Sequence, residues 1–391
     1  MVSRPHILPV ALATETRAEY WLLRPIYRAL EKQRGCQPTF LASGMHHLAR
    51  FGRSIDAIRA DSVRVRSIRT ASGNEDNPAA RAKAIGRAVT GFARELVDFD
   101  WLIVLGDRVE MLAAAVAATA LGKPIAHLHG GDVAPGSRDD AVRHAITKLA
   151  HLHFPATADA ARRLRRMGEP AWRIKLAGAP AIDAMRQLSP VNKESLDGLV
   201  GFDTGKPFAL VVQHAAGFDA RQERDFLLGT LRAVEKHFDH AVVIGPGLDA
   251  GSSLLHTTIR DFVAKKTSAN GNSWAFVLTL DQPDYFALLS RAAVLVGNSS
   301  SGIIEAASFR CPVVNVGPRQ RGRLCSGNVI HCEYGKPAVS RAISRAMNDR
   351  GFRTRLARCR SVYGGGQAGE IVARTLVGTK IDRRLLVKET G

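Results

Sequence analysis

The sequence predicts an α/β protein in which two doubly wound domains face a cleft. Short β-rich runs alternate with helical patterns along the whole chain, and this alternation is typical of parallel sheets covered by helices. The runs form two sets, separated by a polar segment at 185–206 that contains Pro190 and Gly201. Such a segment is typical of an inter-domain connection, so we expect one domain over 1–187 and a second over 188–365.

Each set has its own expected strands. In the first set, an apolar helical run at 110–121 stops at Gly122 and joins two of them. The expected strands of the first set are 7–13, 101–105 and 124–129. Those of the second set are 208–214, 241–245, 275–280, 294–298 and 312–317. The strand-helix-strand order predicts parallel pairing within each domain.

The composition is that of a globular protein with a basic surface. Of 391 residues, 46% are hydrophobic, and the formal net charge is +19. Lys and Arg are spread along the chain with few aromatic residues between them, which favours a phosphate-bearing ligand over DNA. The densest basic run, ARRLRRMG at 161–168, has the spacing of a solvated helix face. We therefore expect no nucleic-acid partner, with an RNA-contacting role for this run as the open alternative.

The cysteines and the apolar runs predict a cytoplasmic protein. Five cysteines are scattered without a CxxC pair, so neither a disulfide framework nor a zinc ribbon is indicated. The apolar start at 7–13 is short for a signal peptide, and TETRAEY follows where a cleavage site would stand. No run approaches the roughly 18 uncharged apolar residues of a membrane helix, so we expect no membrane partner.

Two carboxylates are predicted at one edge of the first sheet. The expected strand 101–105 is followed by GDR, which places Asp107 just beyond its end. The expected strand 124–129 is followed by GGD, which places Asp132 in the corresponding position. Parallel sheets bind their ligands outside the carboxyl ends of the strands, so both aspartates are candidates for chemistry.

A helical pattern at 139–153 follows this edge. At about 100° per residue, one arc is apolar, and the other mixes acids, bases, imidazoles and a hydroxyl. The mixed arc contains Asp140, Arg143, His144, Thr147, Lys148 and His151. Because the helix begins just after the sheet edge, we expect this arc to face the cleft, with Asp139 or Asp140 near the helix start.

The histidines of this region raise the alternative of a metal site. His127 and His129 are two apart on an expected strand and point the same way, but that strand is expected to be interior to its sheet. His151 and His153 are also two apart, and on a helix such a pair diverges by about 200°. We therefore expect no metal ion. His129 and His144 are the better site candidates, and His153, on the apolar arc, is expected to be structural.

A phosphate-binding loop is predicted in the second domain. The strand at 294–298 leads into SSSGIIEAASF, so serines stand where a strand gives way to a helix. A helix N-terminus offers free backbone N–H groups and a positive dipole end, although serine also merely caps helices. The residues of this loop are Ser299, Ser300, Ser301 and Gly302. Glu305, one turn later, is a candidate ligand for ribose hydroxyls or simply a first-turn acid.

Six motifs follow one another along nearly the whole chain: TRAEYWLLRP, LGDRVE, HLHGGD, RHAITKLAHLHFPAT, GNSSSGIIEA and GPRQRGR. Together they resemble the UDP-N-acetylglucosamine 2-epimerase family, and its hydrolysing branch in particular. The resemblance implies a glycosyltransferase-B-like fold of two Rossmann-like domains. It also implies a C-terminal helix at 366–391 that crosses back to the first domain, and a homo-oligomer, either a dimer or a tetramer.

The resemblance further implies a reaction without a metal or redox cofactor. UDP-N-acetylglucosamine and water would become N-acetylmannosamine and UDP through a glycal-like intermediate. A base removes the proton at C2 while UDP leaves C1, and water then adds at C1 as a proton returns to C2 with inverted configuration. Such a path needs two proton-handling groups and stabilisation of the leaving group.

Matching positions assign roles to individual residues. Proton transfer goes to Asp107, Asp132 and either Asp139 or Asp140, while His214 would stabilise the leaving group from the second domain. With the candidates above, the residues expected to bind the UDP-sugar are Arg17, His129, Arg143, His144, Ser299, Ser300, Ser301, Gly302, Glu305, Arg319 and Arg323.

Three positions depart from the family pattern. Glu15 in TETRAEY stands where the family often has a glycine that lets the backbone approach phosphate, which puts affinity or substrate choice in question. Asp132 is one methylene shorter than the usual Glu, and Pro318 interrupts an NIGDRQ-like stretch. These differences can mark a branch that uses another nucleotide sugar, such as a 2,4-diacetamido relative.

The leading hypothesis is therefore a hydrolysing nucleotide-sugar 2-epimerase that supplies a mannosamine-type precursor for sialic-acid-like sugars. Three alternatives stay open. A non-hydrolysing epimerase would return UDP-N-acetylmannosamine, and a glycosyltransferase would need an acceptor sugar. A non-catalytic nucleotide-sugar sensor or partner-binding protein would bind its ligand without turnover.

Overall fold

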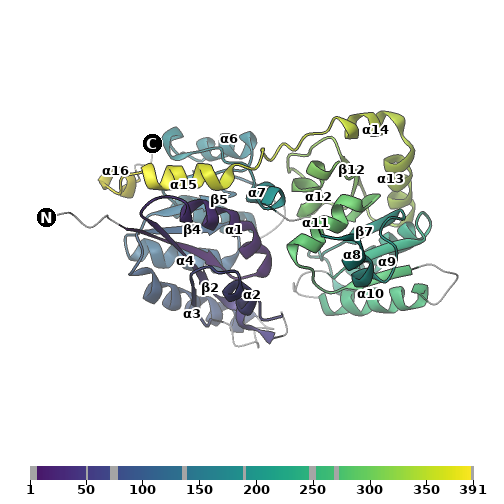
Figure 1. Ribbon diagram of the computed structural model, residues 1–391, viewed down its shortest axis with the longest axis horizontal. Helices are drawn as coiled ribbons and strands as arrows, with labels where there is room; N and C mark the ends of the chain where they lie inside the picture. Colours follow the sequence, from purple (N-terminus) through teal and green to yellow (C-terminus); the bar gives the residue numbers. More distant parts are fainter. Residues whose placement is uncertain are drawn as a thin grey trace. The chain divides into compact units, whose positions relative to one another are not determined.

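The computed structural model describes residues 7–49, 52–70, 78–133, 139–187, 191–245, 252–267 and 273–388. They form two compact units (Figure 1). Unit 1 contains the described residues up to Val133, those at 139–187 and those from Tyr363 onward, and unit 2 contains those at 191–362. The chain therefore returns to unit 1 after completing unit 2.

Unit 1 is built on a six-stranded parallel sheet with the order β3-β2-β1-β4-β5-β6. Its strands are β1 (Leu8–Thr14), β2 (Cys36–Ala42), β3 (Val65–Ser67), β4 (Trp101–Leu105), β5 (Ile125–Leu128) and β6 (Leu152–Phe154). Its helices are α1 (Arg17–Glu31), α2 (Ile55–Ala60), α3 (Pro78–Leu96), α4 (Val109–Ala120), α5 (Asp139–Leu149), α6 (Ala158–Arg166), α7 (Pro180–Gln187), α15 (Ala368–Gly378) and α16 (Arg383–Leu386), with 3₁₀ turns at Gly44–His47 and Ala171–Arg173. The order reverses between β1 and β4, as in doubly wound sheets.

Both faces of this sheet are buried, which explains why its strands are continuously apolar. Successive residues of β1 alternate between two cores: Val10 and Leu12 pack with α1 and α15, while Ala11 and Ala13 pack with α3 and α4. Helix α15 lies against α1, and the Asp183 carboxylate accepts the backbone N–H groups that begin α15. The returning C-terminal segment thus forms part of the core of unit 1.

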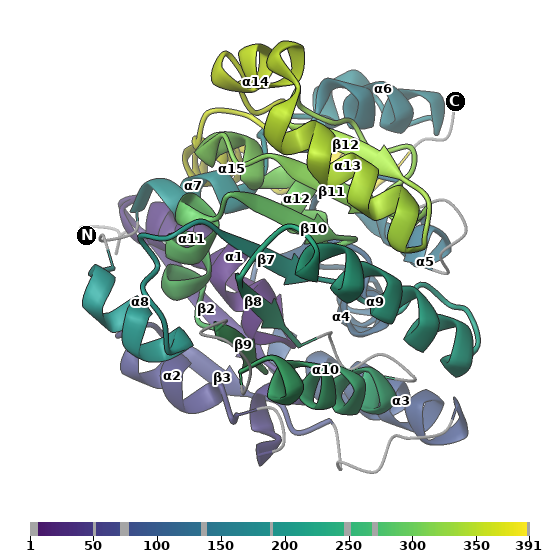
Figure 2. The same cartoon turned by 90° about the vertical axis from the view of Figure 1, so that its right-hand side faces the viewer.

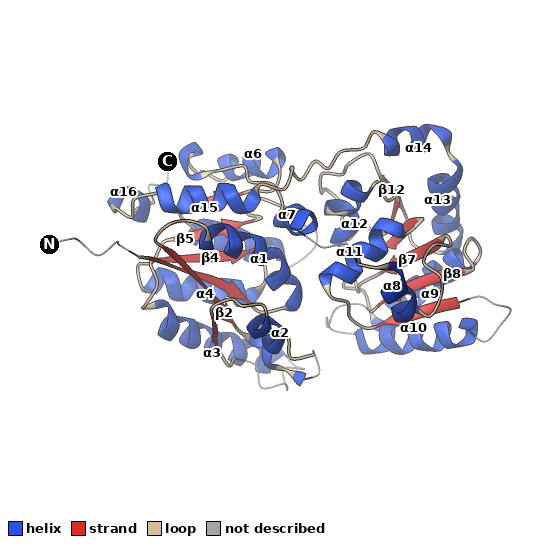
Figure 3. Ribbon diagram, in the orientation of Figure 1, coloured by secondary structure: helices blue, strands red, loops and turns tan. Residues whose placement is uncertain are grey.

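Unit 2 has a second six-stranded parallel sheet with the order β12-β11-β10-β7-β8-β9 (Figure 2). Its strands are β7 (Phe208–Val212), β8 (His240–Ile244), β9 (Ser273–Val277), β10 (Val294–Gly297), β11 (Val313–Val316) and β12 (Val329–Cys332). Its helices are α8 (Lys193–Val200), α9 (Ala220–Glu235), α10 (Ser252–Thr267), α11 (Gln282–Arg291), α12 (Ser300–Ile304), α13 (Lys336–Asn348) and α14 (Arg350–Ala357), with a 3₁₀ turn at Ala306–Phe309. Helices and strands alternate as the sequence predicts (Figure 3).

The helix expected over 139–153 was predicted too long. Helix α5 ends at Leu149, and Leu152–Phe154 forms the edge strand β6, whose His153 pairs with His127 of β5. Leu152, His153 and Phe154 are all buried, because they pack on the sheet rather than on a helix face. No helix among the described residues is long and apolar enough to cross a membrane.

Candidate active site

The Asp107 turn lies at the carboxyl edge of the first sheet. Strands β4 and β5 are parallel neighbours, with Leu105 opposite Leu128. After Leu105 the chain turns at Gly106, whose φ of 77° favours glycine, and Asp107 follows. Asp132 comes shortly after β5, so the two aspartates occupy the same edge, as their positions after neighbouring strands predict.

Arg143 of α5 connects the aspartates of this edge. Its guanidinium donates to the carboxylates of Asp107 and Asp140, and to the backbone carbonyl of Asp132 at 3.0 Å. The residue is only 1% exposed. The structure shows Arg143, which we expected to bind substrate from a cleft-facing arc, buried against these acids. A guanidinium that contacts two carboxylates fixes their relative positions, so the contacts of Arg143 position the acids.

His129 and Asp132 form a second polar pair. His129 Nδ1 lies 2.8 Å from Asp132 Oδ2. His129 has a φ of 61°, a left-handed conformation that is uncommon outside glycine and is often found at functional sites. The strained backbone and the hydrogen bond together fix the direction of the Asp132 carboxylate.

His127, buried beneath this edge, supports the Asp107 turn from below. Burial lowers the pKa of His127 to about 3, so the ring is neutral at physiological pH. Its Nε2 lies 2.8 Å from the carbonyl oxygen of Gly106, which only accepts hydrogen bonds. The ring proton must therefore be on Nε2, and Nδ1 accepts the hydroxyl of Thr147 at 3.3 Å. His127 thus acts as a structural residue of the site.

The remaining candidates of unit 1 lie around the same loops. Asp139 is exposed at the first position of α5, and Arg17 is partly exposed at the first position of α1. His144 is partly buried, burial lowers its pKa, and its buried Nδ1 has no hydrogen-bond partner among the described residues. His153, as expected, is a structural residue: it is fully buried and bonds Glu169 at 2.9 Å.

In unit 2, Asn298 fixes the loop that carries His214. The carboxamide of Asn298 accepts the backbone N–H of His214 at 2.7 Å and donates to its carbonyl oxygen at 2.8 Å. A side chain at Gly297, just before Asn298, would lie 2.0 Å from the carbonyl oxygen of Val212, so only glycine fits there. Burial, together with nearby Arg319, lowers the pKa of His214 to about 3. The His214 ring is therefore neutral at physiological pH.

Arg319 and Gln320 complete this loop from the next connection. Arg319 Nη1 and Gln320 Nε2 donate to the carbonyl oxygen of Asn298 at 3.1 and 2.9 Å. Arg323 lies farther along the connection and lines a cavity of about 280 Å³ together with Arg321 and His331. Arg319 therefore belongs with the His214 loop, and Arg323 lines a cavity formed by the same connection and β12.

The serine loop begins the short helix α12. Ser299 is its N-cap, and its hydroxyl accepts the N–H of Ser301 at 3.3 Å. Ser301 Oγ accepts the hydroxyl of Tyr285, whose pKa is raised by burial. Glu305 closes the helix instead of lying within its first turn, because α12 spans only 5 residues. A Cβ at Gly302 would lie 2.8 Å from a Val313 methyl, so this glycine permits close packing of the helix on β11.

Glu15 has a partner that the sequence does not reveal. Its carboxylate is 5% exposed and accepts a hydrogen bond from Arg108 Nε at 2.8 Å. Arg108 also lies 3.7 Å from Glu19 and 3.5 Å from Glu110. Burial raises the pKa of Glu15, and Arg108 opposes that rise. The bulky anion expected to face phosphate is therefore compensated within unit 1 by the residue that follows Asp107.

Comparison with known families identifies the chain. The model of the UDP-N-acetylglucosamine 2-epimerase family matches residues 28–377. The chain belongs to this family. It is 32% identical, over 98% of this chain and 99% of the relative, to the UDP-N,N'-diacetylbacillosamine 2-epimerase (hydrolyzing) of Legionella pneumophila. It is 27% identical, over 83% of this chain and 84% of the relative, to the GDP/UDP-N,N'-diacetylbacillosamine 2-epimerase (hydrolyzing) of Campylobacter jejuni.

Solved structures of 2-epimerases share the fold. The UDP-GlcNAc 2-epimerase of Neisseria meningitidis, bound to UDP-GlcNAc, superposes with a TM-score of 0.81 at 17% identity, covering 95% of this chain and 100% of that one. The enzyme of Methanocaldococcus jannaschii, in complex with UDP-GlcNAc and UDP, gives 0.77 at 18% identity, covering 95% and 100%. The glycosyltransferase-B-like fold and the family predicted from the motifs are therefore confirmed, and the chain is an enzyme of the 2-epimerase type.

Proposed function

We propose that this 2-epimerase is hydrolysing and acts on a UDP-linked 2-acetamido sugar, either UDP-N-acetylglucosamine or a 2,4-diacetamido relative. The relatives named as hydrolysing support the outcome, and the diacetamido substrates in their names support the second sugar. The observation that carries the proposal is the convergence of Asp107, Asp140 and the Asp132 backbone on one buried guanidinium. Several carboxylates at one edge suit a reaction that both removes and returns a proton.

The proposed reaction has two balanced steps. In the first, a carboxylate takes the proton from C2, the electron pair forms the C1–C2 double bond, and the C1–O bond breaks to release UDP. In the second, water supplies its oxygen to C1, one proton is taken from that water, and another is delivered to the opposite face of C2. The products are a mannosamine-type sugar and UDP.

The two units would divide the work. Asp107, Asp132 and Asp139 are assigned to proton transfer, while Arg143 positions Asp107 instead of touching the sugar. In unit 2, the serine loop and Arg319 are assigned to the diphosphate, and Glu305 to the ribose. His214, neutral by virtue of its low pKa, would donate a hydrogen bond to the leaving phosphate.

Proton and phosphorus NMR of the purified protein with UDP-N-acetylglucosamine in D2O tests the proposal. The expected products are free UDP and N-acetylmannosamine that carries deuterium at C2. UDP-linked mannosamine would instead select the non-hydrolysing reaction, and UDP release that requires an acceptor sugar would select a glycosyltransferase. If UDP binds but no product forms, the 2,4-diacetamido sugar is tested next, and failure with both sugars would overturn the proposed substrate class.

A further inference from the structure

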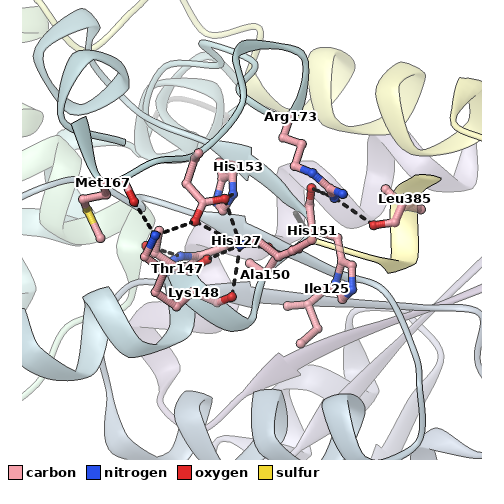
Figure 4. A network of polar contacts seen from close by, with 12 residues as sticks. Ile125, His127, Thr147, Lys148, Ala150, His151, His153, Met167, Arg173 and Leu385 are labelled. Carbon is pink, nitrogen blue, oxygen red and sulfur yellow. Dashed lines mark hydrogen bonds and ion pairs between the residues drawn. The ribbon is translucent and has the colours of Figure 1, made fainter. Parts of the chain in front are cut away.

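Two cations, one buried and one partly buried, hold the end of the chain against unit 1. The first is Arg173, which is 2% exposed. Its guanidinium donates to the carbonyl oxygens of His151 at 3.0 Å and Leu385 at 2.8 Å (Figure 4). It also donates to those of Arg384 at 2.9 Å and Val387 at 3.0 Å. Because these acceptors are backbone atoms, the contact fixes the path of the tail and requires little of its side chains.

The second cation is Lys388, which caps helix α5. Its ammonium lies 3.2, 3.0 and 2.8 Å from the carbonyl oxygens of Thr147, Lys148 and Ala150, and its three N–H groups are shared between these oxygens and Glu169. Carbonyl groups in the last turn of a helix lack partners within the helix and carry the negative end of its dipole. A lysine from the far end of the sequence therefore satisfies the C-terminus of α5.

Glu169 anchors the lysine. Its side chain is 1% exposed and lies 2.8 Å from Lys388 Nζ and 2.9 Å from His153 Nε2. Lys148 Nζ lies 3.4 Å away on the exposed side. Burial opposes the charge of Glu169, but the hydrogen bonds from His153 and Lys388 outweigh it and lower the pKa of the carboxyl to about 2. Burial lowers the pKa of Lys388, while its contact with Glu169 opposes that change, so each partner favours the charged form of the other.

Helix α5 also fixes the Asp107 turn from two sides. Thr147, in its last turn, donates to His127, and His127 donates to the carbonyl of Gly106. Arg143, one turn earlier, holds the carboxylate of Asp107. Thr147 thus has two contacts on this path, because its carbonyl accepts Lys388 while its hydroxyl orders the ring beneath the turn (Figure 4).

We propose that Lys388 is a positioning residue for the 2-epimerase reaction, acting through α5 on the Gly106–Asp107 turn. The inference rests on the proposed role of Asp107 in proton transfer. Without Lys388, the carbonyl groups in the last turn of α5 lose their cap. The backbone that carries the Thr147 hydroxyl and the Arg143 guanidinium is then less well fixed. Small displacements of a reacting group are costly, so turnover should fall while UDP binding, assigned to unit 2, stays the same.

The test compares Lys388→Met, Lys388→Arg and the control Arg383→Met, which removes the same charge from an exposed position of the tail. For Lys388→Met we expect kcat to fall about tenfold with an unchanged Kd for UDP. Hydrogen exchange, followed by mass spectrometry, should increase in peptides covering 139–154. Lys388→Arg should recover most of the turnover, and Arg383→Met should match the wild type.

Three results would overturn the inference. One is a normal kcat in folded Lys388→Met, and another is unchanged hydrogen exchange in α5. The third is an equal loss of kcat in Arg383→Met, which would mean that the effect comes from the change in net charge. If Lys388→Met does not fold, Thr147→Val is the second test. It replaces the Thr147 hydroxyl with a methyl group, and it should show the same loss of activity, confined to kcat. Full activity of Asp107→Asn would instead refute the proposed role of Asp107, so the two failures are distinguishable.

Discussion

The loops at the carboxyl ends of the two sheets are ordered by different kinds of contact. In unit 1, the buried charge of Arg143 holds the carboxylates of Asp107 and Asp140. In unit 2, the neutral carboxamide of Asn298 holds both backbone groups of His214. The first arrangement uses a buried cation to compensate anions. The second uses a neutral carboxamide, and Arg319 donates to the backbone carbonyl oxygen of Asn298 beside it.

This difference suits different ligands. A site that takes and returns protons needs carboxylates of fixed direction, and a charged clamp provides that direction. A site for a diphosphate needs hydrogen-bond donors and positive charge, and a carboxamide orders its loop without adding an anion there. The contrast therefore supports assigning proton transfer to unit 1 and UDP binding to unit 2.

The largest expected effect comes from Asp107→Asn. The amide keeps the size of the side chain but cannot take a proton, so turnover should fall about 1000-fold, within the range for a general base. The Kd for UDP should stay within about twofold, because the diphosphate is assigned to the other unit. Steady-state kinetics and calorimetry measure the two quantities.

Asp159→Asn is the matched control for this variant, since Asp159 pairs with Arg162 on the surface of α6, away from the Asp107 turn's contacts. Its turnover should equal that of the wild type. Near-normal activity in Asp107→Asn would mean that Asp107 takes no part in proton transfer. It would also contradict the different roles assigned to the two units.

A smaller effect is expected from Asn298→Ala, which removes the carboxamide that orders the His214 loop of unit 2. It removes both side-chain contacts to the His214 backbone, and an unpaired buried polar group costs about 1–3 kcal/mol. We expect the Kd for UDP to rise about tenfold, equivalent to about 1.4 kcal/mol. Asn348→Ala, at an exposed position of the same unit, is the control. An unchanged Kd in Asn298→Ala would separate the loop from nucleotide binding.

The pH dependence of stability should reveal the buried His127. Its folded pKa, about 3, is below the ordinary value of 6.5. The unfolded chain therefore binds a proton first as pH falls, so the stabilisation is complete above pH 6.5 and is lost toward pH 3. Between pH 6.5 and about 5.5 this group should lower the free energy of unfolding by about 1 kcal/mol.

Denaturant titrations of the wild type and His127→Gln at the two pH values measure this contribution. His127→Gln should lack this pH-dependent contribution. The difference in the free energy of unfolding between the wild type and the variant should therefore narrow as the pH falls. A constant gap would mean that the ring is not held neutral in the folded state.

Much of the fold and part of the site followed from sequence pattern. Asp107 and Asp132 could be placed on one edge because neighbouring parallel strands end on the same side. The burial of Arg143 could not be predicted, since a helical projection separates apolar from polar residues and does not show which polar side chain the neighbouring acids enclose. The partnership of Glu15 with Arg108 links residues far apart in sequence, and neither pattern nor spacing encodes it. Lys388, near the end of the chain, gave no periodic signal at all.

The smallest effect is expected from Ser301→Ala, and it tests the serine loop directly. Ser301 Oγ accepts from Tyr285, so its own proton is available to a phosphate oxygen. Losing that donor should weaken UDP binding about threefold to tenfold, the cost of one hydrogen bond to a charged group in partial contact with water. Tyr285→Phe is the decisive companion, because it removes the neighbouring hydroxyl and leaves that of Ser301 in place. Weaker binding in Ser301→Ala alone assigns the contact to the serine, whereas equal losses in both variants would mean that the hydrogen bond only orders α12.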